Sequence, residues 1–146
     1  MDWKYTEPNY SMATVDSGDS VDQAMAEFCQ HIKTQVTPKN DSVAWDYLRV
    51  EMWSDSGRMI VYPASTLNPL RIEKAACQVF FSDLLSAYEL IADSGLNDEA
   101  FVAEIIREEG EWIDRFLDAA RRVGLFGKPI QFWDGDGDEP IRVEQI

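Results

Sequence analysis

Histidine, cysteine and catalytic motifs are what this 146-residue sequence has least of. It contains one histidine, His31, and two cysteines, Cys29 and Cys77, without CxxC spacing. Residues i and i+2 point to different sides of a helix, so Cys29 and His31 are not expected to form a catalytic couple. We expect His31 to lie at the surface or boundary of its helix. The motifs HExxH, GxSxG and GxGxxG and the P-loop are absent as well, so no motif identifies a function.

Long apolar segments are also missing. No apolar run approaches the roughly 20 residues that a membrane-spanning helix needs. The N-terminus has no basic start followed by an apolar block, so we expect no secretory signal. Two thiols on apolar helix faces are typical of reduced core cysteines, and we therefore expect a cytoplasmic protein.

Basic residues are scarce, and the charge is the most informative number. The chain has 13 Lys and Arg against 27 Asp and Glu, a net charge of −14. This argues against binding nucleic acid, whose phosphates require a basic surface, and against anionic membranes. Acidic residues concentrate between Glu73 and Asp114, and again from Asp134 to the C-terminus. The charge provides solubility, or it forms an acidic face for a basic protein partner.

The hydrophobic pattern predicts a single α+β domain over residues 1–146. We expect an antiparallel sheet made of two hairpins, packed on three helices. The hairpins are predicted at about 44–62 and 130–145, and the helices at about 20–36, 69–94 and 98–123. Residues 1–19 are expected to form an irregular arm or a short edge strand near Tyr10–Val15.

The helix boundaries follow from capping signals. Ser20 and Gln23 form a capping box at the first helix, and Pro38 is expected just beyond its end. Asn68 and Gly95 bracket a segment whose apolar residues cover well over half of a helical wheel. That pattern predicts a helix over 69–94 at the centre of the core. Asn97 and Gly124 bracket the third helix, in which Gly110 marks a kink or a close contact.

Alternating polar and apolar residues predict the first hairpin, and the length of its loop decides between two registers of the strands. With a four-residue loop over 54–57, the buried face holds Leu48, Val50, Met52, Met59 and Val61. The opposite face then holds Tyr47, Arg49, Glu51, Trp53, Arg58, Ile60 and Tyr62. A loop one residue shorter would redirect the second strand, so the register stays open.

The acidic loop Asp134–Glu139 begins like a calcium-binding EF-hand. Glu139 stands where that motif requires glycine, and Gln145 stands where it requires a bidentate glutamate. We therefore expect neither a metal nor another cofactor. The loop is a flexible hairpin tip, or an acidic finger that reaches a basic cleft.

Two carboxylates fall on apolar helix faces. Asp83 and Glu109 lie where the wheel predicts burial, and a buried acid needs a partner or serves a function. A hydrogen-bonding partner is the commoner explanation. A hydrolase that uses both carboxylates is the alternative.

Size, charge and α+β order resemble the immunity proteins that bacteria make against interbacterial toxins, although no diagnostic motif matches. That resemblance implies an inhibitory binding protein whose acidic residues occupy a basic site on the toxin, as a monomer or a homodimer. Trp53, Tyr62, Trp112 and Trp133 are aromatics available to an interface or to the core. The expected partner-binding residues are Trp133, Asp134, Asp136, Asp138, Glu139, Glu104, Glu108 and Glu111. A secretion-type chaperone that binds a client segment, or a carboxylate hydrolase, are the alternatives.

Overall fold

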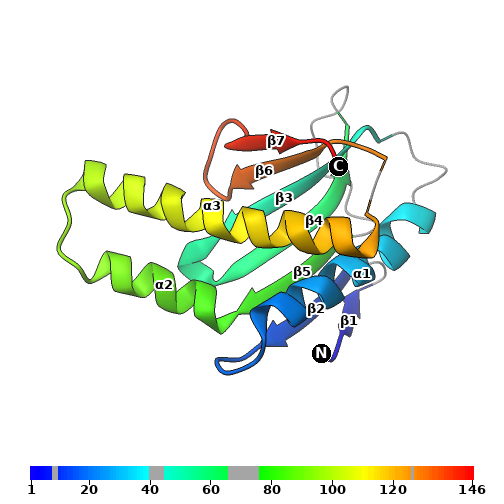
Figure 1. Cartoon of the computed structure of the whole chain (residues 1–146), viewed down its shortest axis with the longest axis horizontal. Coiled ribbons are helices and arrows are strands. Elements are labelled where there is room, and N and C mark those ends of the chain that lie inside the picture. The colour runs from blue at the N-terminus through cyan, green and yellow to red at the C-terminus, as the bar shows by residue number, and fades with distance from the viewer. Residues whose placement is uncertain (8–9, 40–44, 66–75, 126) are drawn as a thin grey trace.

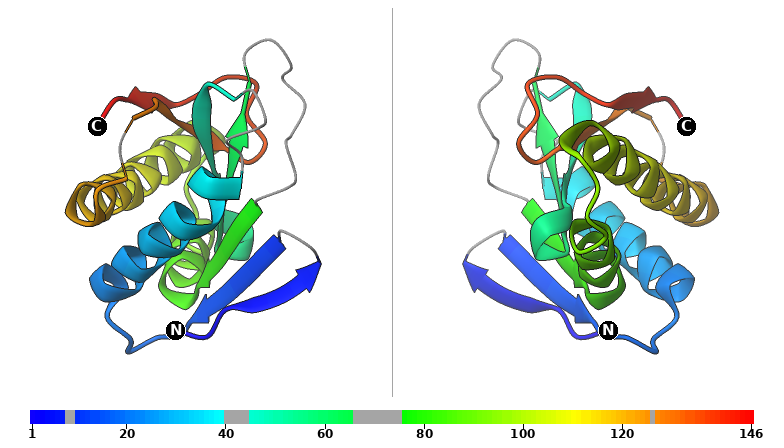
Figure 2. Two further views of the ribbon diagram at one scale, coloured as in Figure 1. Left: turned by 90° about the vertical axis from the view of Figure 1, so that its right-hand side faces the viewer. Right: turned by 90° about the vertical axis from the view of Figure 1, so that its left-hand side faces the viewer.

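A computed structural model describes residues 1–7, 10–39, 45–65, 76–125 and 127–146. Within them, seven strands form one sheet, and three helices lie along one side of it (Figures 1 and 2). In chain order, the elements are β1 (Lys4–Glu7), β2 (Tyr10–Val15), α1 (Val21–Lys39), β3 (Tyr47–Trp53), the 3-10 turn η1 (Ser54–Ser56), β4 (Arg58–Ala64), β5 (Ala76–Phe81), α2 (Ser82–Ala92), α3 (Asp98–Val123), β6 (Ile130–Asp134) and β7 (Arg142–Glu144).

The sheet is mixed, with the strand order β1-β2-β5-β4-β3-β6-β7. The pairs β2–β5 and β3–β6 are parallel, and the other neighbouring pairs are antiparallel. The prediction of an antiparallel sheet built from two hairpins is therefore wrong. Both hairpins form, but the N-terminal arm and β5 add three strands, and the two hairpins join through a parallel pair. Side-chain alternation carries no information about strand direction, so the sequence pattern left this undetermined.

The predicted helix over 69–94 is also wrong. Residues 76–81 form β5, the helix α2 covers only Ser82–Ala92, and residues 69–75 lie outside the described part of the chain. Both faces of β5 are covered, so Cys77 and Val79 on one face and Ala76 and Gln78 on the other are at most 3% exposed. A strand buried on both faces shows no alternation, and its apolar run resembles a segment of a buried helix.

The other two helices form where capping predicts them. The Asn97 side chain accepts the N–H of Ala100, and Gly124 ends α3 in the left-handed conformation, so the helix over 98–123 is confirmed. Ser20 accepts the N–H of Gln23 at the start of α1. The end of α1 was predicted too early, because the helix continues through Pro38 to Lys39. The strand Tyr10–Val15 is internal, because β1 pairs with its outer side.

The first hairpin has the four-residue loop. Trp53 pairs with Arg58, so Leu48, Val50, Met52, Met59 and Val61 share the buried face as predicted. Gly57 is required in this loop for two reasons. Its φ is +70°, and an added Cβ would lie 2.9 Å from Cβ of Leu85 on α2. The hairpin loop is thereby packed against the start of α2.

The main core lies between the sheet and the helices. Phe28 of α1, Phe116 of α3 and Phe132 of β6 are fully buried there, with ring centroids 5.6–6.3 Å apart in successive pairs. The α2–α3 hairpin extends past the end of the sheet (Figure 1). Large apolar side chains remain exposed along that extension, namely Leu90, Leu96, Val102 and Ile106. In the described part of the chain, no helix has both the length and the apolar character needed to cross a membrane.

Candidate functional site

A groove of about 380 Å³ opens at the end of the sheet where the α2–α3 hairpin extends beyond it. One wall is apolar and is formed by Tyr88 of α2 with side chains of α3. The α3 residues in this wall are Phe101, Val102, Ile105 and Ile106. The facing wall comes from the end of β3, from η1 and from the β6–β7 turn. The groove therefore joins segments that are far apart in the sequence.

The apolar wall exists because α3 carries more hydrophobic residues than its packing uses. Farther along α3, Trp112, Ile113 and Phe116 are buried in the core. In its first half, Val102 and Ile106 are each 52% exposed, because the sheet no longer lies beneath them. Phe101 packs edge-to-face on Tyr88 with the ring centroids 6.0 Å apart. The helix therefore presents an ordered apolar surface to solvent.

The facing wall is fixed by the β6–β7 turn. The Gly135 N–H donates to the Met52 carbonyl at 2.8 Å, which ties the turn to β3. The Trp53 ring lies directly against Gly135, where an added Cβ would come within 2.3 Å of it. The Trp53 indole N–H donates to Glu51 at 3.1 Å, which sets the orientation of the ring. Only glycine at position 135 lets the turn approach this closely.

Glu109 of α3 lies in the groove and is 1% exposed. The Ser54 hydroxyl donates to its Oε2 at 3.1 Å, whereas Oε1 receives no hydrogen bond from a donor group of the described residues. Burial raises the pKa of Glu109 from 4.5 to about 8. The Asp134 carboxylate adds to the shift through its charge and through a hydrogen bond with Glu109, the Asp55 charge adds a smaller part, and the Ser54 hydrogen bond opposes it. At neutral pH the Glu109 carboxyl is therefore mainly protonated.

The groove is acidic as well as apolar. Its described lining includes the carboxyl side chains of Asp55, Glu109, Asp134 and Asp136, and no lysine, arginine or histidine. Asp134 is further oriented by the Asp136 N–H, which donates to its Oδ1 at 3.0 Å. Because Asp55, Asp134 and Asp136 line the same concave surface, their charges add to a negative potential in the groove.

The structure separates the predicted partner-binding residues into different places. Asp134 and Asp136 line the groove, while Asp138 and Glu139 are exposed in the same turn outside its lining. Trp133 points to the opposite face of the sheet, and its ring lies 3.9 Å from the guanidinium carbon of Arg49. The other three predicted residues lie around Arg107 on α3, with a carboxylate oxygen 3.0–3.8 Å from a guanidinium nitrogen. They are Glu104, Glu108 and Glu111.

Sequence reasoning did not assign Ser54, Asp55 or the apolar wall to a site. For Ser54 and Asp55 the sequence shows only turn-forming residues, because their role depends on η1 lying against α3. For Val102 and Ile106 a signal was present, since the apolar stripe of α3 is wider than one packed face requires.

The two anomalous carboxylates differ in their surroundings. Glu109 is buried with Ser54 as its partner, whereas Asp83 is only half-buried and is not among the described residues that line the groove. The alternative of a hydrolase that pairs Asp83 with Glu109 is therefore not assembled in this groove. The described residues also contain no group of three or more His, Cys, Asp or Glu side chains that is arranged to hold a metal ion.

The histidine is more buried than expected, and two of the four singled-out aromatics belong to the core. His31 is 8% exposed, stacks on Trp3 with the ring centroids 3.7 Å apart, and lies 2.7 Å from the Ser11 hydroxyl. The expectation that His31 lies at the surface or boundary of its helix is wrong, because the N-terminal segment packs over it and buries it. Tyr62 and Trp112 are at most 4% exposed, which leaves them to the interior.

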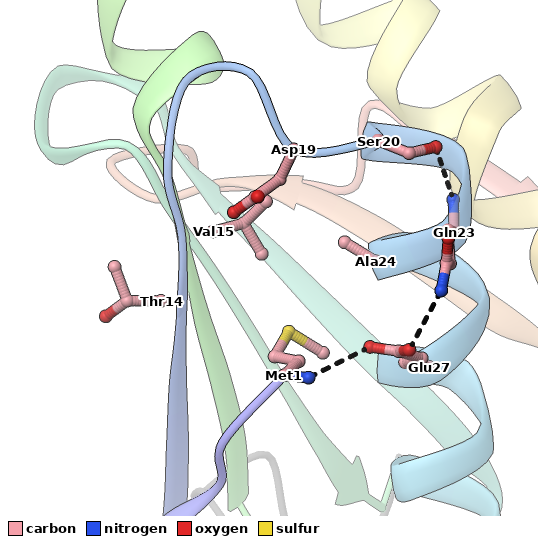
Figure 3. Close-up of a pocket in the computed structure, with 8 residues that line it drawn as sticks. All are labelled: Met1, Thr14, Val15, Asp19, Ser20, Gln23, Ala24 and Glu27. Atoms are coloured by element: carbon pink, nitrogen blue, oxygen red, sulfur yellow. Dashed lines mark hydrogen bonds and ion pairs between the residues drawn. The ribbon is translucent and has the colours of Figure 1, made fainter.

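A second hollow, of about 200 Å³, lies between β2 and the start of α1 (Figure 3). The α-amino nitrogen of Met1 lies 3.5 Å from Oε2 of Glu27, and the Gln23 amide donates to Oε1 of the same carboxylate. Because these polar groups interact with each other, this hollow is a weaker candidate than the groove.

Comparisons with protein-family models, with curated proteins and with solved structures found no match to this chain.

Proposed function

We propose that the protein binds and neutralises a basic protein partner, and that the groove beside α3 is the centre of the contact. In this proposal it acts as an immunity protein, forming a stoichiometric complex with an interbacterial toxin in the bacterial cytoplasm. Asp134 and Asp136 are retained from the predicted binding residues. Ser54, Asp55, Glu109 and the apolar wall of α3 are added to them.

One observation carries the proposal, namely an exposed apolar wall that faces four carboxyl side chains in a groove without a basic residue in its described lining. Interface centres are commonly apolar with charged surroundings, which is the arrangement here. The overall charge of −14 would steer a basic partner toward the protein, while burial of Val102 and Ile106 would slow its dissociation.

The first prediction concerns protection from a toxin. The test first sequences the genes on either side of this one for a large secreted protein, and then expresses the chain together with the C-terminal domain of that protein. We expect the wild-type chain to restore growth and to co-purify with the toxin domain at 1:1 stoichiometry. The variant Ile106→Glu should lose protection, because a charge on the apolar wall opposes desolvation of the interface. Ile106 is half-exposed, so this change does not disrupt the core.

Glu111→Gln is the matched comparison, because Glu111 lies on the same helix beside Arg107 and outside the described lining of the groove. Protection that survives Ile106→Glu and fails with Glu111→Gln would move the contact to the outer face of α3. Absence of any growth rescue or complex would contradict the immunity function itself.

A second candidate is a hydrolase that uses Glu109 as a general acid. The favouring observation is the raised pKa of Glu109 beside the Asp134 carboxylate, a combination that acid–base catalysis employs. A panel of chromogenic glycosides tests this candidate. Hydrolysis by the wild-type chain that disappears in Glu109→Gln would favour the enzyme.

A further inference from the structure

The Oε1 atom of Glu109 is buried in the groove and receives no hydrogen bond from a donor group of the described residues, while a hydrogen bond with the Asp134 carboxylate favours the protonated form of Glu109. Ionising this carboxyl group without a donor for its second oxygen would cost free energy, and a bound cationic group would supply that donor. Ser54 already donates to Oε2, so Oε1 is the oxygen that can accept a hydrogen bond from an incoming donor once the carboxyl group is ionised.

The charges around that oxygen select the kind of donor. Asp55 comes from η1, Asp134 from the end of β6 and Asp136 from the β6–β7 turn, and all three line the same groove. No positive side chain in the described lining balances them. A cationic donor therefore gains from every carboxylate, whereas an anionic ligand is repelled by all of them.

The apolar wall favours a ligand that carries an apolar part next to its positive charge. Lysine and arginine carry a charged head on an apolar stem, and they bury the stem along apolar surface while the head is hydrogen-bonded. Ile105 and Ile106 line the groove on the same helix as Glu109, within one turn of it. The groove thus offers a surface for the stem next to carboxylates for the head.

We propose that the groove receives a lysine or arginine side chain, flanked by apolar residues on a segment of the partner protein, with its cationic head against Glu109 and Asp134. This inference rests on the proposed function, because it names the chemistry by which the partner is recognised.

Binding of the cation is coupled to release of one proton. Glu109, protonated in the free protein, ionises when the positive head arrives, and its proton passes to the buffer. The titratable groups that face it in the groove are Asp55, Tyr88, Asp134 and Asp136, of which three add negative charge. The affinity for the cation should therefore rise as the pH increases from 6 to 8.

The second prediction uses a pair of blocked pentapeptides. One has a central arginine between two leucines, and the other has citrulline, the neutral isostere of arginine, in the same position. Titration of the full chain is followed by amide resonances in heteronuclear NMR spectra. We expect the arginine peptide to shift the resonances of Ser54, Asp55, Glu109 and Asp134. The citrulline peptide should bind about tenfold more weakly, through loss of one charge-assisted interaction.

Two variants separate recognition by Glu109 from general electrostatics. Glu109→Gln should weaken the arginine peptide about tenfold and remove the proton release. Asp118→Asn removes the same charge from α3, but at an exposed position paired with Arg121, and should leave binding unchanged. A thermal melt of each variant confirms that it is folded.

Several outcomes would overturn the inference. Equal binding of both peptides would make the groove a purely apolar site. Shifts confined to other residues, or no saturable shift up to the solubility limit, would reject it outright. Concentration-dependent dimerisation that occupies the groove would identify a second copy of the chain as the occupant. Toxin neutralisation that survives Glu109→Gln and fails with Ile106→Glu would reject this inference while supporting the proposed function.

Discussion

Burying the Glu109 carboxyl group costs folding free energy, and in our proposal the same group recognises a cation of the partner. Its carboxyl group is buried at the end of the core, where the Ser54 hydroxyl satisfies one oxygen and Asp134 and Asp55 oppose ionisation. A residue chosen only for packing at this position would be apolar. Keeping an acid here therefore points to a use for the acid, which in our proposal is to pair with a cation of the partner.

The third prediction follows from the same carboxyl group. Its pKa of about 8 in the folded protein exceeds the ordinary value of 4.5. The folded state thus binds more protons than the unfolded state between these values. The stability associated with protonated Glu109 is fully present below about pH 4.5 and is lost as the pH rises through about 8. Glu109→Gln should therefore match the wild-type stability near pH 5 and exceed it at pH 9, by on the order of a few kcal/mol.

Urea denaturation at pH 5, 7 and 9 measures the difference. Asp118→Asn serves as the control for the general effect of removing one negative charge from a chain of net charge −14. A difference between Glu109→Gln and the wild type that does not vary with pH would contradict the buried, protonated carboxyl group.

The helix α3 has two parts with different tasks. Its second half packs Phe116 and Leu117 into the core against α1 and the sheet. Its first half extends beyond the sheet with α2 and carries the apolar wall of the groove. Gly110 lies where these parts meet, and an added Cβ there meets no atom within 4 Å. The expectation of a close contact at Gly110 is therefore wrong.

The fourth prediction is that Gly110→Ala stabilises the protein. Alanine fits the open space and removes the conformational entropy that glycine brings to the unfolded chain, a gain of about 0.5–1 kcal/mol. Differential scanning calorimetry should show a rise in Tm of about 2–4 °C per kcal/mol for a chain of this length.

Gly57→Ala is the contrasting variant. Position 57 has a φ of +70°, and its added Cβ would lie 2.9 Å from side-chain atoms of Leu85 and Phe80. It should lower Tm, since both the backbone and the packing oppose a side chain there. A decrease in Tm with Gly110→Ala would contradict this prediction and would indicate that glycine at position 110 serves a bend in α3.

As a whole, the molecule combines a large negative charge with a local apolar groove. The charge acts over a Debye length and accelerates encounters, whereas the groove acts only after contact. The two should therefore affect different rate constants of the complex.

The fifth prediction tests that division by surface plasmon resonance with the purified partner. Raising the NaCl concentration from about 50 to about 500 mM should slow association by at least tenfold and leave dissociation nearly unchanged. Ile106→Ala should mainly accelerate dissociation. An association rate that is insensitive to salt would contradict electrostatic steering.

The sequence alone determined the elements whose signals are local. Asn97 and Gly124 cap α3, the alternation in 44–62 predicts the first hairpin and, with the four-residue loop, its buried face, and the acidic residues Asp134 and Asp136 stand out in their loop. Each of these depends on neighbours within a few residues along the chain, so pattern and propensity suffice.

Only the tertiary structure decided the strand directions, the burial of β5 and the assembly of the groove. The direction of the pairs β2–β5 and β3–β6, the burial of both faces of β5, and the meeting of Ser54 with Glu109 join segments far apart in the sequence. An apolar run buried on both faces looks the same in a strand and in a helix. A groove, moreover, exists only where α3 extends past the sheet. Local chemistry selected the acidic residues, and the packing of distant segments placed two of them, Asp134 and Asp136, in the groove beside α3.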